Sequence, residues 1–304
     1  MKGTRVAIVV AVLAASIFLA VPRVIMADNS GDESVAELAS AAPFNNDPYI
    51  VKQWAVPQSS VPPVAAANSQ ILIAVLDTGI DVNHKDLAGE VVDSVNFTGG
   101  RNTDDVNGHG THVAGIIVAA RNNGIGIAGT APSVKLLNVK VGEDNGVVWP
   151  SNVAKGIIWA TDRGAKIINI SLTVPSRYQP LEEAINYAWS HGVVLVAAAG
   201  NHVKATTYPA AYSNVIAVAA TTPDGKVWTE SNDGEFVDAY APGVSIVSTL
   251  PGTKYGEQSG SSMATAYVSA IAAQLINQTT DTDSDGKIND EIEGLLKTRF
   301  SKPN

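Results

Sequence analysis

An acid, a base and a nucleophile, the residue types that together cleave acyl bonds, each lie in a distinctive short string of this sequence. Asp77 lies in Val-Leu-Asp-Thr-Gly-Ile-Asp (75–81), His109 in Gly-His-Gly-Thr-His-Val-Ala-Gly (108–115) and Ser262 in Ser-Gly-Ser-Ser-Met-Ala-Thr-Ala (259–266). A serine hydroxyl is a weak nucleophile at neutral pH. It needs a base that takes its proton, and the base needs a carboxylate that holds its tautomer and stabilises the imidazolium. The three strings therefore predict nucleophilic catalysis.

Each of these residues also has a simpler interpretation. Asp77 could be a turn or cap residue, His109 could be structural, and Ser262 could be a helix N-cap. The occurrence of all three strings in one chain favours catalysis. For His112, three residues after His109, we expect a packing or supporting role instead.

Short apolar runs alternate with helical stretches from residue 71 onward. We expect strands at 71–76, 134–141, 166–172, 193–198 and 215–219, and helices at 111–120, 152–163, 181–191, 262–277 and 291–299. Pro180 and Gly192 are start and stop signals of the third helix. Nearly continuous apolar strands are typical of a parallel sheet covered on both faces. The alternation predicts an α/β fold with a three-layer, doubly wound, mostly parallel sheet.

These elements would place the reactive residues at one edge of the sheet. Asp77 ends a strand, and open α/β folds bind ligands at the carboxyl ends of their strands. Ser262 opens a helix, whose free N–H groups can stabilise an oxyanion. Asn201 follows another strand, and its side-chain amide can be the second oxyanion donor, although a plain turn residue is the alternative.

The order Asp, His, Ser along the chain is that of subtilisin, and it differs from the orders of chymotrypsin and the α/β-hydrolases. On these strings the chain resembles the subtilisin-like serine proteases, or subtilases. Asn-Asp-Pro-Tyr at 46–49 resembles the thermitase branch, and the resemblance runs from about residue 46 to about residue 300. It implies a subtilisin-like fold and a serine endopeptidase that forms an acyl-enzyme. The implied catalytic residues are Asp77, His109, Ser262 and Asn201.

Several positions depart from the family pattern. Ser261 stands where Thr is usual, and Ala266 and Tyr267 replace the usual Pro-His, which we interpret as altered packing with activity retained. In the family, the strand resembling 170–172 pairs with the substrate. Two β-branched residues, Thr173 and Val174, replace glycines there, and Thr207 lies where a glycine often lines the first specificity pocket.

We expect these β-branched side chains to narrow the pocket, unless the backbone shifts and leaves it open. The substrate-binding residues implied by the resemblance are Ser171, Leu172, Thr173, Gly200 and Thr207.

The resemblance also implies a structural Ca²⁺ that fixes the N-terminal segment, with Asp47, Asp86 and Asn123 as ligands. Oxygen ligands suit this cation, and a solvated turn is the alternative. A second candidate is the loop 281–289, which resembles an EF-hand loop through its ninth position. Ile292 occupies the twelfth position, where a carboxylate belongs, so the loop's acids could instead favour the N-terminus of the following helix.

The N-terminus suggests export. Lys2 and Arg5 precede an apolar run at 6–21, so residues 1–27 are expected to form a signal peptide, with an uncleaved anchor as the alternative. Residues 28–43 read as a flexible acidic leader, shorter than the usual folding-assisting propeptide. Residues 44–304 form the expected peptidase domain, including the acidic loop 281–293.

Composition supports a secreted globular protein. The 304 residues are 45% hydrophobic and 16% charged and include no cysteine, so the core must stabilise the fold without disulfides. Loss of residues 1–27 lowers the net charge from −9 to −12. An acidic surface argues against nucleic acid and anionic membranes as partners. We expect a monomeric, extracellular protein whose partners are protein or peptide substrates.

Two other functions remain open from the sequence. A catalytically weak, subtilase-like binding protein is suggested by the short leader and the substituted glycines, but it would not need the complete set of catalytic residues. A lipase-like esterase would need a Gly-x-Ser-x-Gly elbow, and Ala264 stands where its second glycine belongs.

Overall fold

The computed structural model describes residues 46–56, 71–201 and 205–303, which all belong to the unit formed by residues 44–304. The predicted signal peptide (1–27) and acidic leader (28–43) lie outside the described residues. Among the described residues, no helix has the length and apolar character needed to cross a membrane.

Seven parallel strands form the central sheet. They are β1 (Leu72–Asp77), β2 (Val91–Asn96), β3 (Lys135–Lys140), β4 (Ile167–Ile170), β5 (Val194–Ala198), β6 (Ile216–Thr221) and β7 (Ala239–Pro242). Their order is β2-β3-β1-β4-β5-β6-β7. Every residue of β4, β5 and β6 is buried, which explains the continuous apolar runs in the sequence.

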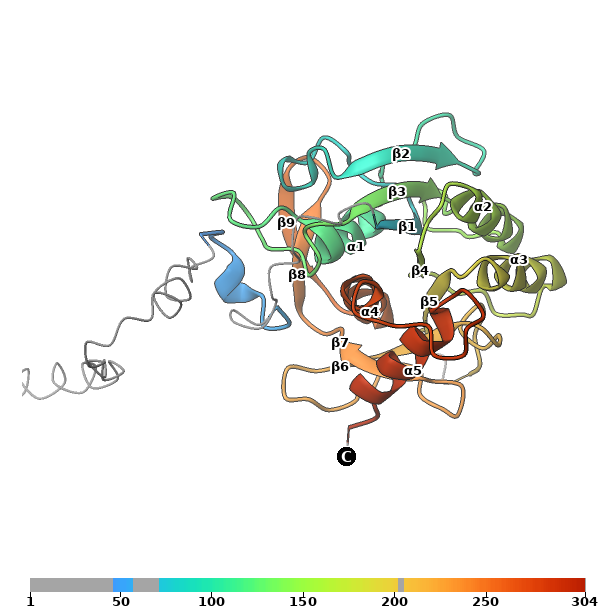
Figure 1. The fold of residues 1–304 in the computed structure, drawn as a ribbon. Coiled ribbons are helices and arrows are strands. Elements are labelled where there is room, and N and C mark those ends of the chain that lie inside the picture. Colours follow the sequence, from blue (N-terminus) through green and yellow to red (C-terminus); the bar gives the residue numbers. More distant parts are fainter. Residues whose placement is uncertain (1–45, 57–70, 202–204, 304) are drawn as a thin grey trace, which may run out of the picture. The chain divides into compact units, whose positions relative to one another are not determined.

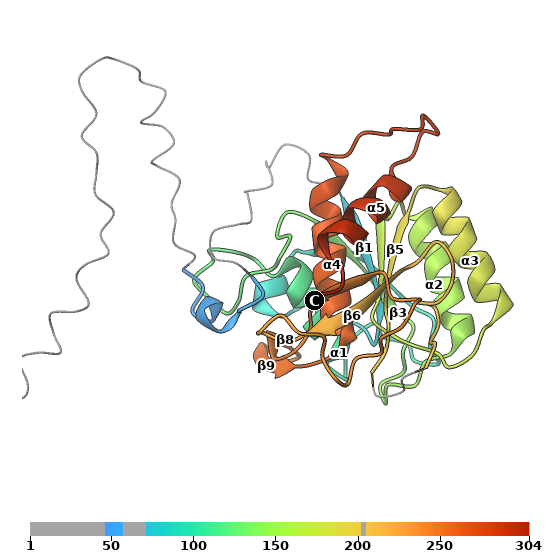
Figure 2. The same ribbon diagram turned by 90° about the horizontal axis from the view of Figure 1, so that it is seen from below.

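Helices cover both faces of the sheet (Figures 1 and 2). On one face lie α1 (His109–Val118), α4 (Ser261–Ile276) and α5 (Asn289–Arg299); on the other lie α2 (Pro150–Asp162) and α3 (Gln179–Ser190). Each face has its own apolar core, one shared with α1, α4 and α5 and one with α2 and α3. The expected three-layer, doubly wound, mostly parallel α/β fold is confirmed.

Two short turns of 3-10 helix, η2 (Ile50–Lys52) and η4 (Lys85–Leu87), and an antiparallel hairpin complete the described structure. The hairpin consists of β8 (Ile246–Leu250) and β9 (Lys254–Gln258), and it packs beside α1 (Figure 1). Ser248 Oγ and Thr249 Oγ1 each donate a 2.7 Å hydrogen bond to a carbonyl oxygen of α1. Gly115 allows this approach, because a Cβ there would lie 2.2 Å from Thr249 Oγ1.

The hairpin also leads directly to α4, because β9 ends at Gln258 and α4 begins at Ser261. The sequence-based expectation missed this hairpin, as well as β2 and β7.

Candidate active site

The acid and the base meet where β1 ends and α1 begins. Asp77 is the last residue of β1 and His109 the first of α1. His109 Nδ1 and Asp77 Oδ1 are 2.7 Å apart, and Asp77 is 1% exposed whereas the His109 side chain is 25% exposed. Asp77 Oδ1 also accepts a 2.7 Å hydrogen bond from the Thr78 N–H. The carboxylate thus holds the imidazole through Nδ1, and Nε2 is left to accept a proton.

The electrostatics of this pair favour the imidazolium. Burial alone would lower the pKa of His109, but the attraction and hydrogen bond of Asp77 and the nearby charge of Asp105 outweigh it. The net result is a pKa raised above the usual 6.5 of histidine.

The predicted nucleophile is linked to the predicted substrate strand. Ser262 Oγ donates a 3.0 Å hydrogen bond to Ser171 O, and Ser171 Oγ donates a 2.9 Å bond to Ser262 O. Behind them, buried Asn169 donates to Ser171 Oγ and accepts from Ser269 Oγ. No hydrogen bond joins Ser262 to His109 in the part of the chain that the structure describes, and the hydroxyl must give up its bond to Ser171 O before it can donate to the base.

Two N–H groups lie beside Gly260. A Cβ on Gly260 would lie 3.1 Å from Asn201 Nδ2 and 3.7 Å from the Ser262 nitrogen. Asn201 Oδ1 accepts a 2.9 Å hydrogen bond from the Ser261 N–H, which sets the orientation of the amide. Within the described residues neither donor has an acceptor, so both can bind an oxyanion formed beside Ser262.

The segment after β4 has free backbone groups. Leu172 and Thr173 make no backbone hydrogen bonds with other described residues, whereas Val174 pairs with Tyr208 in both directions, at 2.7 and 3.0 Å. Unpaired N–H and C=O groups on an extended segment can add a peptide as a further strand.

Two threonine methyl groups border the predicted first pocket. The Cγ2 atoms of Thr173 and Thr207 would each lie 3.4 Å from a Cβ built on Gly200. Thr207 Oγ1 donates a 2.7 Å hydrogen bond to Ala199 O, which holds its side chain in place. Val174 is different, because it is 5% exposed and packs in the core beneath α2 and α3. That Val174 narrows the pocket stays a prediction, and its burial shows that the side chain also contributes to the core.

His112 has the supporting role expected of it. Its ring is fully buried, and Nε2 lies 3.1 Å from Ile246 O and 3.2 Å from Gly256 O, so it joins α1 to both strands of the hairpin. Burial, and secondarily the charge of His109, lowers its pKa to about 4. It is therefore neutral over most of the pH range.

Sequence reasoning missed two buried charged residues near the pair. Asp105 is 4% exposed and accepts hydrogen bonds from Thr78 and from the first turn of α1. Lys140, 2% exposed at the end of β3, donates to Thr78 O and pairs with Asp144 at 2.8 Å. The position of Asp105, shortly before a helix whose N-cap is a glycine, is a signal that could have identified it. Lys140 is a single lysine in an apolar run, and the sequence gives no comparable signal for it.

The three predicted calcium ligands lie around one loop, at residues 121–127. Asp47 accepts hydrogen bonds from the N–H groups of Asn122, Asn123 and Gly124, at 2.9 to 3.2 Å. Asn123 Nδ2 donates a 2.7 Å bond to Asp86 Oδ1. The carboxylates are 1% and 0% exposed, respectively.

This donor set fits a hard cation. The candidate ligands are the oxygens of two buried carboxylates and of one amide. Asn123 Oδ1 accepts a 2.9 Å hydrogen bond from the Ile125 N–H, so it would have to exchange this bond for the ion by a half-turn of the amide. Asp86 Oδ2 also accepts from the Ile127 N–H at 3.0 Å and from the Tyr255 hydroxyl at 2.9 Å. The site therefore also contacts β9.

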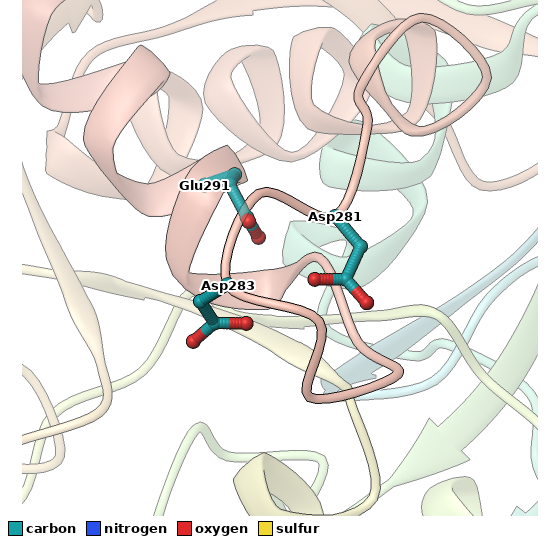
Figure 3. Close-up of side chains that lie close together, drawn as sticks. All are labelled: Asp281, Asp283 and Glu291. Carbon is teal, nitrogen blue, oxygen red and sulfur yellow. The ribbon is translucent and has the colours of Figure 1, made fainter.

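The C-terminal loop gathers a second group of acids. Carboxylate oxygens of Asp281, Asp283 and Glu291 lie within 4.8 Å of one another (Figure 3). Glu291 turns toward the loop and accepts hydrogen bonds from the N–H and hydroxyl of Thr282, which lower its pKa to about 2. Ile292, at the twelfth position, is fully buried in the core. The helix register thus directs the eleventh rather than the twelfth residue at the loop.

A parallel α/β sheet whose carboxyl edge gathers a carboxylate–imidazole pair and a helix-borne serine has the architecture of a serine hydrolase. Residues 68–299 match the subtilase family. The chain is 45% identical over 238 residues to thermitase of Thermoactinomyces vulgaris, covering 77% of this chain and 85% of thermitase. It is 43% identical over 227 residues to subtilisin Savinase of Lederbergia lenta, covering 74% and 82%.

The chain is also 44% identical over 271 residues to the thermophilic serine proteinase of Bacillus sp. (strain AK1), covering 87% of this chain and 66% of that protein. The chain thus spans slightly less than two thirds of that relative's length. It belongs to the subtilase family of subtilisin-like serine endopeptidases, and the thermitase-like resemblance seen in the sequence is confirmed.

Proposed function

We propose that this chain is a secreted serine endopeptidase that cleaves peptide bonds through Asp77, His109 and Ser262. The observation that carries the proposal is the 2.7 Å contact of buried Asp77 with His109 Nδ1, since it leaves the second ring nitrogen free as a base. Family membership and the relatives' names, thermitase and serine proteinase among them, support the reaction type.

The proposed reaction proceeds in two halves. His109 Nε2 takes the proton of Ser262 Oγ as this oxygen attacks the peptide carbonyl, while Asn201 Nδ2 and the Ser262 N–H stabilise the oxyanion. His109 then gives the proton to the leaving amine, which departs and leaves an acyl-enzyme. Water, activated by the same imidazole, hydrolyses this ester and restores the serine.

The substrate is proposed to bind as an extra strand along Ser171, Leu172 and Thr173. The free backbone groups of the last two would supply the hydrogen bonds, and Gly200 and Thr207 would form the first pocket with Thr173. This arrangement suits unfolded or extended peptide segments rather than compact protein surfaces.

Export, a structural Ca²⁺ at Asp47, Asp86 and Asn123, and a monomeric state are further parts of the proposal. In this proposal, residues 1–27 are the cleaved signal peptide, residues 28–43 a leader and residues 44–304 the peptidase domain. Calcium is supported by the buried, all-oxygen donor set, and the ion would tie the N-terminal segment to the loop at 121–127. The acids of Figure 3 are the alternative location.

A fluorophosphonate probe together with a peptide substrate tests the proposal. The full chain should be labelled at Ser262 and cleave the peptide, and Ser262→Ala should lose both. Ser259→Ala is the matched control, because Ser259 is a neighbouring exposed serine whose hydroxyl accepts a hydrogen bond from the Ser245 N–H. Full activity in Ser262→Ala, or labelling of another serine, would refute the assignment.

The same assay tests the oxyanion donor. Asn201→Ala should lower kcat by about 10²–10³-fold, the magnitude known for such a donor in subtilisin itself, with little change in KM. If the protein were a binding protein, the probe would leave it unlabelled while peptides still bound.

A further inference from the structure

Asp105 is a buried carboxylate beside the catalytic pair that makes four hydrogen bonds. Its Oδ1 accepts from Thr78 Oγ1 at 2.9 Å and from the Gly108 N–H at 2.8 Å. Its Oδ2 accepts from the N–H and the hydroxyl of Thr111, at 2.8 and 2.7 Å. Both oxygens are thus satisfied by groups in the segments that carry Asp77 and His109.

The first function of these bonds is to cap α1. The residue at the N-cap is Gly108, which has no side chain and a φ of +96° that other residues rarely adopt. Asp105 replaces the missing cap, because it binds the N–H groups of Gly108 and Thr111 from three residues upstream of the glycine. The start of α1, and so the position of His109, depends on this carboxylate.

The second function is to join α1 to β1. Thr78 follows Asp77 in the chain, and its hydroxyl donates to Asp105 while accepting a 3.1 Å hydrogen bond from the Gly110 N–H. Gly110 allows this contact, because a Cβ there would lie 2.1 Å from Gly79 O. The Asp105–Thr78 link therefore sets the spacing between the acid and the base.

The charge of Asp105 acts on His109 as well. Asp77 and Asp105 both raise the pKa of His109, and the neighbouring ring of His112 is kept neutral by burial. Lys140, which donates to Thr78 O, is already paired with Asp144. The elements packed against α1 carry further titratable groups, which are His84, Lys85 and Asp86 at η4, Lys135 on β3 and Tyr267 on α4.

We propose that Asp105 is a positioning residue of the catalytic centre, which holds His109 at its distance from Asp77 and stabilises the positive charge formed on the imidazole during the reaction. This inference rests on the proposed role of His109 as the base. It assigns a function to a second buried carboxylate that does not itself touch the substrate.

The test compares Asp105→Asn with Asp104→Asn. Asp104 is the adjacent exposed carboxylate, so its charge is screened by solvent. For Asp105→Asn we expect kcat to fall by roughly tenfold to a hundredfold. In the pH profile of kcat/KM, the midpoint of the acid limb should move to lower pH by roughly half a pH unit to one pH unit. Asp104→Asn should keep both values. A kcat loss without movement of the acid limb would overturn the electrostatic part, and no change would overturn the whole.

Two further measurements keep the inference falsifiable. Asp105→Glu retains the charge but displaces the cap, so the acid limb should stay while kcat falls; wild-type kinetics in this variant would refute positioning, even if Asp105→Asn does not fold. NMR titration of the His109 ring in Ser262→Ala reads its pKa without activity. Suppose that Asp105→Asn lowers the pKa of the His109 ring while Ser262→Ala remains active. This combination would support the role of Asp105 and reject Ser262 as the nucleophile.

Discussion

At the residue scale, the behaviour of the site is governed by two carboxylates and one imidazole. Asp77 and Asp105 both favour the protonated ring of His109, whereas burial opposes it. A stabilised imidazolium lowers the energy of the transition state, in which the ring has taken the serine proton. The cost is that the ring is neutral, and able to act as a base, only at higher pH.

The pH profile should show this cost. His109 must be neutral to accept the proton, and its pKa is raised, so kcat/KM should rise through a pKa above the usual value of about 6.5. The measurement is kcat/KM for a peptide substrate between about pH 5 and pH 9 at constant ionic strength. A flat profile, or a midpoint well below the ordinary histidine value, would contradict the assignment of His109.

Substrate selectivity should reflect the two threonine methyl groups beside Gly200. Both approach the same point of the pocket, so small or medium apolar side chains should be preferred over Phe and Tyr. Replacing both Thr173 and Thr207 by glycine should shift preference toward Phe by roughly 1–3 kcal/mol in kcat/KM.

A peptide library varied at the residue before the cleaved bond measures this selectivity. Val174→Gly is unsuitable as a pocket variant, because Val174 is part of the core. Strong Phe preference in the unmodified chain would show that the backbone has opened the pocket.

At the element scale, most of the fold could be predicted because its strands are buried on both faces. The expected strand at 193–198 became Val194–Ala198, and the expected helix at 181–191 became Gln179–Ser190. The missed strands lack that signal. At the sheet edge, β2 contains half-buried and exposed residues and no fully buried one, and β7 ends in a proline. Polar side chains of the hairpin, which consists of β8 and β9, bind to α1, and their partners there are distant in sequence.

The contact of α1 with the hairpin should make the fold acid-sensitive. His112 has a folded pKa of about 4 against about 6.5 when unfolded, so between these values only the unfolded chain binds the proton. Stability present above pH 6.5 should therefore be lost as the pH falls, by roughly 3 kcal/mol in total. His109, whose pKa is raised, acts in the opposite direction: it adds stability as the pH falls toward 6.5, and this contribution is constant well below that pH.

Denaturant unfolding of the Ser262→Ala protein at several pH values measures this effect. His112→Gln should flatten the pH dependence, whereas His191→Gln should leave it unchanged, because His191 is exposed at the end of α3. An identical slope in His112→Gln would contradict the prediction.

At the scale of the whole molecule, stability should depend on calcium. The chain contains no disulfides, and Asp47, Asp86 and Asn123 join segments about 40 to 75 residues apart in sequence. Bound calcium should add about 2.7 kcal/mol at a hundredfold excess over Kd. Asp86→Asn should reduce the calcium-dependent part of the Tm shift, and Asp283→Asn should affect it less.

Melting curves with calcium and with chelator, in the Ser262→Ala protein, give these shifts. A Tm that does not change with chelator would reject a stabilising calcium site. A shift lost in Asp283→Asn but retained in Asp86→Asn would move the ion to the acids of Figure 3.

The site residues differ in how far the sequence could identify them. Asp77, His109 and Ser262 have rare local strings around them, and these strings suffice to propose them. Asp105 and Asn169 act through partners that only the fold brings near, such as Thr78 and Ser269. The direction of Glu291 cannot be read from the sequence, because it follows from the burial of the neighbouring Ile292 in the core.

The central place of α4 has a consequence for when activity begins. This helix packs against β4, β5, β6, β7 and α1, and it carries Ser262 at its start. A chain made from its N-terminus contains the proposed acid and base long before the serine. The serine lies beside them only once α4 has packed on the sheet, which requires contacts between segments distant in sequence. If Ser262 is the nucleophile as proposed, we expect a copy in which α4 is not yet packed to be unable to cleave peptides, so that activity begins only when the fold is complete.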